Sequence, residues 1–344
     1  MNQENLAIIS NEKTQNINNK VFCDNIDMKS VPEGLSQNFN VELFLRKSKV
    51  ERISHQINLK KIFLSGSILT FLLKIWNRSA KHKKYLVISL SPYTFFACLL
   101  LFILKKRVYL YLRSDGYEEY RCYSKIFGPI IYHVMFAISS KITNLIVCRS
   151  HLLRKKTGFV VSPSQLNDKW FSKRKEPNLN QIKILYIGRI KKEKGIFSFL
   201  NLIKKIEENI KIKIINSEKK YDKRLDSKNV EIINFENKND SIIEVYDDHN
   251  VFILPSFTEA HPQVLDESLA RLRPVIIFPE ISHVKRDREG VFVAERKAES
   301  LVKVIGFIMK NYFEIQKKMI KNNLPTKKAF LNEISKIIKN EKSK

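Results

Sequence analysis

The stretch PSFTEAHPQVLDESLARLRPVIIF, Pro255 to Phe278, carries the clearest structural signal in this chain. It begins at the end of VFILP (Val251–Pro255), a short apolar run typical of a buried strand, and closes on a second such run, PVIIF (Pro274–Phe278). A helical pattern lies between the two runs. Strands that alternate with helices predict a parallel sheet covered on both faces. Because ligands in such sheets bind beyond the carboxyl ends of the strands, functional residues are expected directly after Pro255.

Two carboxylates lie eight positions apart in this stretch, Glu259 in the expected loop and Glu267 in the expected helix, Pro262–Leu272. At about 100° per residue, the three leucines of the helix form one stripe, and Glu267 points nearly the opposite way. Glu267 can then face a cleft and accept hydrogen bonds from hydroxyl groups; the alternative is a solvent-facing carboxylate. No Ser, Thr, Asp or Asn stands beside the helix start, so its backbone N–H groups and dipole suit a diphosphate.

A second segment, YIGRIKKEKGI (Tyr186–Ile196), ends a strand at Gly188 and then presents Arg189 and Lys194. A guanidinium offers a planar fork for phosphate oxygens, and an ammonium offers a point charge. In a chain of net charge +27 these two cations alone carry little information. The two segments together are much more specific.

The rest of the chain shows the same alternation of strands and helices. Further strands are expected at Leu6–Ser10, Val41–Leu45, Leu86–Ser91, Val108–Leu112, Asn144–Cys148, Ile184–Gly188, Lys211–Ile215 and Val230–Phe235. Helices are expected at Ser67–Lys74, Tyr93–Lys105, within Tyr117–Ser139, after Ile196, and from Asn239–Ser241 onward. The pattern predicts an α/β protein of two doubly wound domains facing a central cleft. The expected divisions are a first domain (1–165), a linker (166–181), a second domain (182–325) and a C-terminal helix (326–344) able to pack back on the first domain.

A strand ending in Gly-Arg, a Lys-Gly that opens a helix, and a Pro-Ser strand end with E-x7-E and Pro-Val-Ile resemble the family 4 glycosyltransferases of the GT-B fold (glycosyl transferases group 1). The resemblance is good over residues 182–295 and looser in the first half. It implies two Rossmann-like domains, a nucleotide-sugar donor in the second, and a retaining reaction that needs no cofactor and no metal ion.

The resemblance also implies roles for individual residues. Arg189 and Lys194 would bind the donor diphosphate, Glu259 would contact the donor sugar near its reacting carbon, and Glu267 would hold the ribose hydroxyls. The remaining donor-binding residues would be Gly188, His261, Val264 and Leu265.

Two features depart from the family pattern. His261 stands where Glu-Gly-Phe is common, and it either tunes the choice of donor sugar or forms a bulkier wall. After the first strand, SNEKTQNINNK replaces the usual Gly-rich loop, and no glycine occurs before Gly34. The acceptor side is therefore not predictable by analogy.

The segment YLYLRSDGYEEY (Tyr109–Tyr120) follows a strand in the first half. Arg113 and Asp115 are candidates for contacting the acceptor, and Asp115 for assisting proton removal, because both follow the strand end. The alternative is that Asp115 caps the helix that begins at YEEY.

The amino-acid composition indicates the partners and the cellular compartment of the protein. Lys and Arg number 62 against 35 Asp and Glu, and such a field attracts anionic lipid, nucleic acid or phosphorylated substrates; the alternative is a solvated, Lys-rich surface. Four cysteines without CxxC spacing indicate free thiols in a reducing compartment. No secretory signal is evident. The uncharged run Leu86–Leu104 could span a bilayer, but Pro92 favours a strand, a turn and a helix.

The sequence thus predicts a hexosyltransferase that moves a sugar from a nucleotide-diphosphate sugar to a glycan or lipid-linked acceptor. Its expected setting is surface polysaccharide assembly (lipopolysaccharide, capsule or exopolysaccharide), in the cytoplasm and peripherally on an anionic membrane face. Two alternatives remain open. One is a GT-B scaffold without turnover, and the other is a nucleic-acid-binding protein, for which no recognised module appears.

Overall fold

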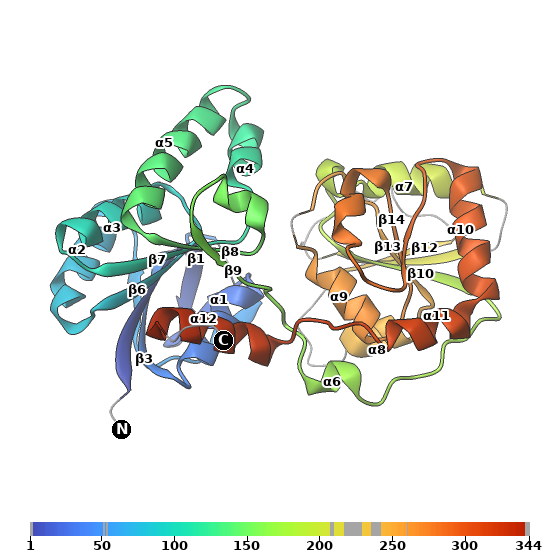
Figure 1. Ribbon diagram of the computed structural model, residues 1–344, viewed down its shortest axis with the longest axis horizontal. Coiled ribbons are helices and arrows are strands. Elements are labelled where there is room, and N and C mark those ends of the chain that lie inside the picture. The colour runs from blue at the N-terminus through green and yellow to red at the C-terminus, as the bar shows by residue number, and fades with distance from the viewer. Residues whose placement is uncertain are drawn as a thin grey trace. The chain divides into compact units, whose positions relative to one another are not determined.

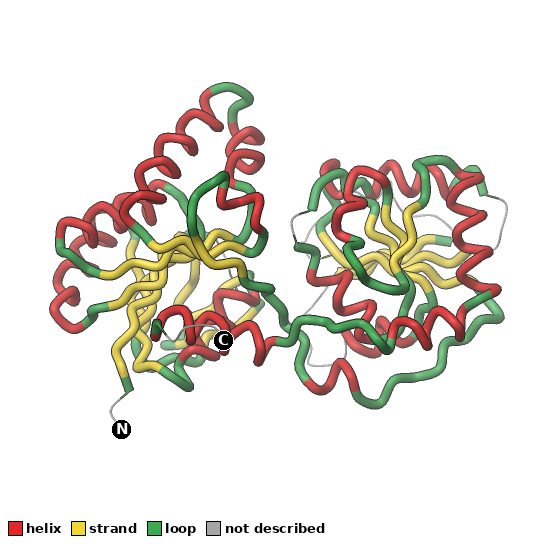
Figure 2. The backbone as a smooth tube through the Cα atoms, in the orientation of Figure 1, coloured by secondary structure: helices red, strands yellow, loops and turns green. Residues whose placement is uncertain are grey.

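The computed structural model describes residues 3–50, 52, 54–206, 210–216, 229–234, 242–259 and 261–340. The chain forms two compact units, Met1–Pro163 with Lys328–Lys344, and Ser164–Lys327. In each unit a largely parallel sheet lies between helices, as Figures 1 and 2 show. The expected helix start at Asn239–Ser241 lies outside the described residues.

The sheet of the first unit is built around β1 (Glu4–Ile17). It pairs in parallel with β3 (Phe39–Lys47) on one side and with β6 (Lys84–Ile88) on the other. The sheet continues through β5 (Ile62–Ser65) beyond β3, and through β7 (Arg107–Leu112), β8 (Asn144–Val147) and β9 (Gly158–Val160) beyond β6. All five strands predicted in the first half are confirmed.

A β-hairpin stands where the family pattern has a Gly-rich loop. β1 continues past its parallel partners and pairs in antiparallel fashion with β2 (Lys20–Cys23), which in turn pairs with β4 (His55–Ile57). The connecting turn uses Asn18 and Asn19, both with positive φ (49° and 62°). Asparagine tolerates this left-handed region, so the hairpin needs no glycine.

Helices cover both faces of this sheet, and alternate residues of each strand point to opposite cores. α2 (Ile68–Arg78), α3 (Pro92–Ile103) and α5 (Phe127–Ile142) cover one face, and α1 (Ile26–Leu35) and α12 (Lys327–Lys339) cover the other (Figure 1). The expected packing of the C-terminal helix on the first domain is what α12 shows.

α12 is held by both apolar and polar contacts. Phe330, Ile334 and Ile338 are buried against the sheet, and the hydroxyl of Tyr109 donates to the carbonyl oxygen of Ile338 at 3.2 Å. The C-terminal helix therefore completes the core of the first unit.

The uncharged run Leu86–Leu104 divides into β6 and α3. Pro92 is the first residue of α3, and Ser91 and Thr94 form a capping box at its start. Among the described residues, no helix combines the length and the apolar character needed to cross a bilayer. Three of the cysteines, Cys23, Cys98 and Cys148, are buried free thiols.

The second unit contains an all-parallel sheet. Its order is β12 (Val230–Asn234), β11 (Ile210–Asn216), β10 (Ile182–Gly188), β13 (Val251–Leu254), β14 (Val275–Ile277) and β15 (Val291–Val293). Its helices are α6 (Asp168–Phe171), α7 (Ile196–Ile203), α8 (Ile242–Asp247), α9 (Gln263–Ala270), α10 (Ala298–Lys310) and α11 (Tyr312–Met319). Along the chain, β11 and β12 are added on one side of β10, and β14 and β15 are then added on the other side of the sheet, beyond β13. The strand order therefore reverses between these two strands, and this is where such sheets bind ligands.

Two fully buried arginines attach the segment before β10 to the second unit. Arg271 forms a two-pronged pair with Asp247 (2.9 and 2.7 Å) and donates to backbone carbonyls from Lys169 to Lys173. Arg273 donates to the carbonyl oxygen of Lys175. Residues 166–181, expected to form a linker, therefore belong to the second unit, and the unit boundary lies at 163/164.

Replacing Arg271 with Met should lower the free energy of unfolding of the second unit by about 3–5 kcal/mol, because Asp247 would remain buried without its main partner. Urea unfolding followed by circular dichroism measures the change. Arg286→Met removes an exposed arginine of the same unit and serves as the control. Equal unfolding midpoints for the two variants would show that the buried pair does not support the unit.

Candidate functional site

The loops after β10 and β13 meet at the point where the strand order reverses. β10 ends at Gly188, a short 3-10 turn follows at Lys192–Lys194, and Gly195 leads into α7. Gly195 has φ +65°, and a Cβ there would collide with the carbonyl oxygen of Pro255. A backbone hydrogen bond from Phe257 N to Glu193 O (3.0 Å) joins the same two loops. Glycine is therefore required for the loops to approach this closely.

This approach brings together two of the residues predicted for the site. Lys194 Nζ lies 2.6 Å from Glu259 Oε1, although 65 positions separate them in the chain. The buried Ser256 donates its hydroxyl to the same carboxylate oxygen at 2.7 Å. Both charged side chains are largely shielded from solvent. The pair thus forms a charged centre of fixed geometry beyond the strand ends.

Two residues farther along the chain, Arg296 and His283, contact the loop after β13 and support it. Arg296 donates to the carbonyl oxygen of Pro255 (2.9 Å), and its guanidinium lies 4.2 Å from the ring centroids of both Phe257 and Phe278. His283 Nε2 lies 3.0 Å from the carbonyl oxygen of Glu259. These supports follow no sequence motif, and the sequence alone did not indicate them.

Helix α9 begins at Gln263, one residue later than expected, with Pro262 as its N-cap residue. In the part of the chain that the structure describes, no side chain forms a cap hydrogen bond at this end. Leu265 is fully buried in the core, so its side chain supports the helix and cannot reach a donor. Val264 is half-buried beside the core.

Glu267 does not face solvent. It is half-buried, and its Oε2 lies 2.8 Å from the hydroxyl of Tyr246, which is fully buried on α8. Burial raises the pKa of Glu267 to about 7; the nearby Asp266 adds to this rise, and the hydrogen bond from Tyr246 opposes it. The open alternative of a solvated carboxylate is therefore wrong.

Glu267→Gln should stabilise the fold at pH 8 but not at pH 4. The raised pKa means that the folded protein favours the protonated form of Glu267. The stability that this carboxyl group contributes is therefore fully present below pH 4.5 and is lost as pH rises through about 7. Above pH 7 the variant with the neutral amide should have a free energy of unfolding roughly 2–3 kcal/mol higher than that of the wild type. Thermal melts of both proteins between pH 4 and 9 measure the difference, and a difference that does not depend on pH would contradict the assignment.

His261 is oriented differently from the expectation. Its side chain is buried, with Nε2 3.5 Å from Asp266 Oδ2, and Asp266 pairs with the buried Arg288 (2.8 Å). The imidazole therefore lies against the interior of the unit, and a role of His261 in the choice of donor sugar stays a prediction. Asp266 and Arg288 were not foreseen, because an Asp inside a helix and an Arg in a basic loop are both common at surfaces.

Arg189 lies directly after β10 and is half-exposed, 3.9 Å from Glu193. A surface pair at this distance is weak, so the guanidinium is available to a stronger anion.

The two candidates in the first unit already have structural partners. Arg113 pairs with Asp27 of α1 at 2.7 Å. Asp115 is the N-cap residue of α4 (Gly116–Tyr123); it accepts from Tyr117 N at 2.9 Å and pairs with Arg154 at 2.9 Å. This is the capping role that the sequence left open. The acceptor role of both residues stays a prediction.

Asp115→Ser should preserve α4, since Ser caps helices about as well as Asp, whereas Asp115→Ala should lower the free energy of unfolding by about 1 kcal/mol. Thermal melts and transfer assays of both variants separate the two roles. A Ser variant that melts like wild type but transfers sugar poorly would favour the acceptor role.

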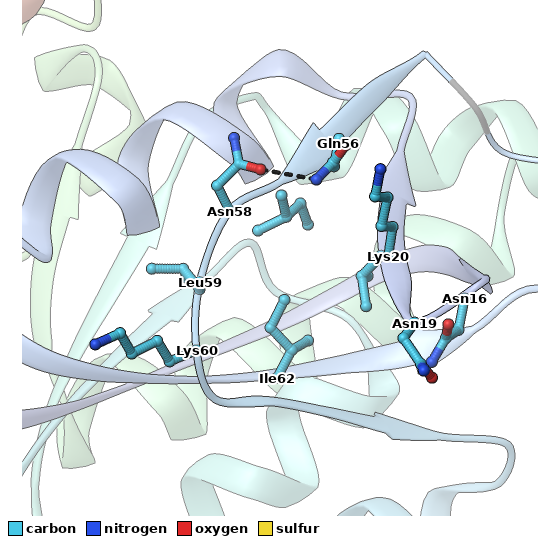
Figure 3. A pocket seen from close by; sticks show the side chains of 10 residues that line it. Asn16, Asn19, Lys20, Gln56, Asn58, Leu59, Lys60 and Ile62 are labelled. Atoms are coloured by element: carbon cyan, nitrogen blue, oxygen red, sulfur yellow. Dashed lines mark hydrogen bonds between the residues drawn. The ribbon is translucent and has the colours of Figure 1, made fainter.

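A hollow of about 380 Å³ lies on the first unit beside β2 and β4 (Figure 3). Asn16, Asn19, Gln56 and Asn58 line it together with Lys20 and Lys60, and Gln56 donates to Asn58 at 2.9 Å. Its lining residues include no carboxylate, so the hollow offers hydrogen bonds and positive charge but no general base. In the described part of the chain, no group of three or more His, Cys, Asp or Glu is arranged to hold a metal ion.

Comparison with known proteins agrees with this geometry. Residues 168–324 match the family described as Glycosyl transferases group 1. The match covers most of the second unit, Ser164–Lys327. No curated protein matches the sequence.

Solved structures extend the likeness to both units. Sucrose-phosphate synthase from Thermosynechococcus elongatus is 15% identical, with a TM-score of 0.72 over 98% of this chain and 99% of that one. Anabaena HepE in complex with UDP-glucose is 11% identical (TM-score 0.66, covering 97% and 95%). WaaG, a glycosyltransferase involved in lipopolysaccharide biosynthesis, is 13% identical (TM-score 0.65, covering 96% and 99%). The fold is therefore GT-B, with two Rossmann-like domains, and the findings together support a glycosyltransferase.

Proposed function

We propose that the protein transfers a hexose, with retention of configuration and without a metal ion, from a nucleotide-diphosphate sugar to a glycan or lipid-linked acceptor. The observation that carries the proposal is the Lys194–Glu259 pair at 2.6 Å beyond the ends of β10 and β13. A cation for the diphosphate and a carboxylate for the sugar stand side by side there, next to the start of a helix without a side-chain cap.

Five of the predicted donor residues then have a task. Arg189 and Lys194 bind the diphosphate, with Gly188 leaving room at the strand end, and charge-assisted hydrogen bonds make this the strongest contact. Glu267 accepts hydrogen bonds from the ribose hydroxyls, and Tyr246 fixes its carboxylate. Glu259 contacts the donor sugar, held in place by Ser256.

The reaction needs little from the protein beyond charge and position. The bond between the sugar's anomeric carbon and the diphosphate oxygen breaks, and the acceptor oxygen bonds to that carbon on the same face. The acceptor proton passes to the departing phosphate. Arg189 and Lys194 stabilise the negative charge that develops on the leaving group.

The setting is surface polysaccharide assembly in the cytoplasm, at an anionic membrane face. The structural likeness to WaaG supports this setting, and the UDP-glucose complex of HepE makes uridine nucleotides the first donors to test. The net charge of +27 is suited to a phosphorylated substrate and an anionic surface.

A thermal-shift screen against UDP-, GDP-, ADP- and CMP-sugars tests the donor site. One nucleotide class should raise the melting temperature by roughly 5–10 °C at about 100 times its dissociation constant. Lys194→Ala and Glu267→Ala should lose the shift. Lys192→Ala removes an exposed lysine two positions away and should keep it.

Other outcomes would overturn parts of the proposal. A shift retained in Lys194→Ala would contradict the site assignment, and binding without sugar transfer to any acceptor would indicate an inactive scaffold. Transfer abolished by EDTA and restored by a divalent cation would contradict metal independence.

A further inference from the structure

The helical layer formed by α2, α3 and α5 is apolar on its outer side as well as its inner side. On α5, Tyr132, Met135 and Phe136 are buried against the sheet, while Phe127, Ile131 and Val134 are 69%, 52% and 51% exposed. The exposed set repeats at helical spacing, so it forms a second apolar stripe on the opposite side of the helix. A helix that is apolar all round is normally covered on all sides.

The neighbouring helices continue this stripe. Leu69, Leu73 and Trp76 of α2 are all more than half-exposed and also repeat at helical spacing. At the end of α3, Phe102 and Ile103 are 56% and 72% exposed. α3 packs beside both α2 and α5, and the three helices form one layer on the same face of the sheet (Figure 1). An apolar surface of this extent marks an interaction site.

The charge around this layer indicates what covers it. Residues 61–148, which contain all three helices, hold 13 Lys and Arg but only 3 Asp and Glu. A second copy of the chain would bring two such positive surfaces together, which costs free energy. An anionic bilayer offers both a complementary charge and an apolar interior.

We propose that the outer face of α2, α3 and α5 lies in the headgroup region of an anionic lipid bilayer, with its apolar side chains inserted and the surrounding lysines on lipid phosphates. No described helix is long and apolar enough to cross a bilayer, so the helices lie along the surface and do not span it. The inference deepens the proposed function and rests on it in one respect. If the acceptor is linked to a lipid, the first domain would meet it at this membrane surface.

Vesicle flotation tests the apolar part of the proposal without using donor or acceptor. Wild-type protein should float with vesicles of phosphatidylglycerol and phosphatidylcholine, and much less with phosphatidylcholine alone. Phe127→Ser with Ile131→Ser should weaken binding about tenfold or more, because each serine removes a large inserted side chain. The matched control is Phe313→Ser with Ile320→Ser, two side chains of similar exposure (55% and 60%) on the second unit.

A charge reversal tests the electrostatic part. Lys105→Glu with Lys125→Glu should reduce binding and its salt dependence, since each basic residue near the surface contributes about 1 kcal/mol. Lys318→Glu with Lys321→Glu changes the net charge equally on the second unit and should leave binding unchanged. All four lysines are exposed or half-exposed, so the fold should tolerate these changes, and thermal melts check this.

Three results would overturn the inference. The first is equal loss of flotation in the α5 and control variants. The second is no binding of wild-type protein to anionic vesicles. The third is a wild-type dimer that becomes a monomer in the serine variant, which would assign the face to a second copy. Nucleotide-sugar shifts measured on the same variants report on the proposed function separately, because none of the substituted residues belongs to the donor site.

Discussion

The candidate site depends on the contact between Gly195 and the carbonyl group of Pro255. Parallel pairing of β10 with β13 places the two following loops side by side, and only a residue without a Cβ lets them meet. That contact sets the position of Lys194 and hence its pairing with Glu259. Any larger residue at 195 would separate the two charges on which donor binding is proposed to rest.

The second unit contains more buried charge than its sequence indicates. Arg271 and Arg273 are enclosed with Asp247, and most of their N–H groups bond to backbone carbonyls. Buried guanidinium groups are costly unless their donors are satisfied, so this network restricts the segment before β10 to one path. Glu267 is a contrasting case, since it accepts a hydrogen bond from Tyr246 but has no cation beside it among the described residues, and burial raises its pKa to about 7.

The first unit has a different physical character. Its sheet is closed on one face by α1 and α12, whereas the helices on the other face present apolar side chains outward among many lysines. The Gly-rich loop of the family pattern is replaced by the β1–β2 hairpin, so acceptor contacts cannot be transferred by analogy. Its candidate residues, Arg113 and Asp115, both have structural partners.

Local patterns in the sequence were enough to predict the strands and the GT-B fold, because burial periodicity and strand-end motifs involve neighbouring positions. The same patterns singled out Lys194, Glu259 and Glu267 as candidates for donor binding, and the fold brings Lys194 and Glu259 together. The patterns could not place His261 in the interior, assign residues 166–181 to the second unit, or reveal Ser256, Tyr246 and Arg296 as supports. Those features join residues that lie far apart in the chain or whose types are common at surfaces. Strand order brings such residues together, and strand order exists only once the chain has folded.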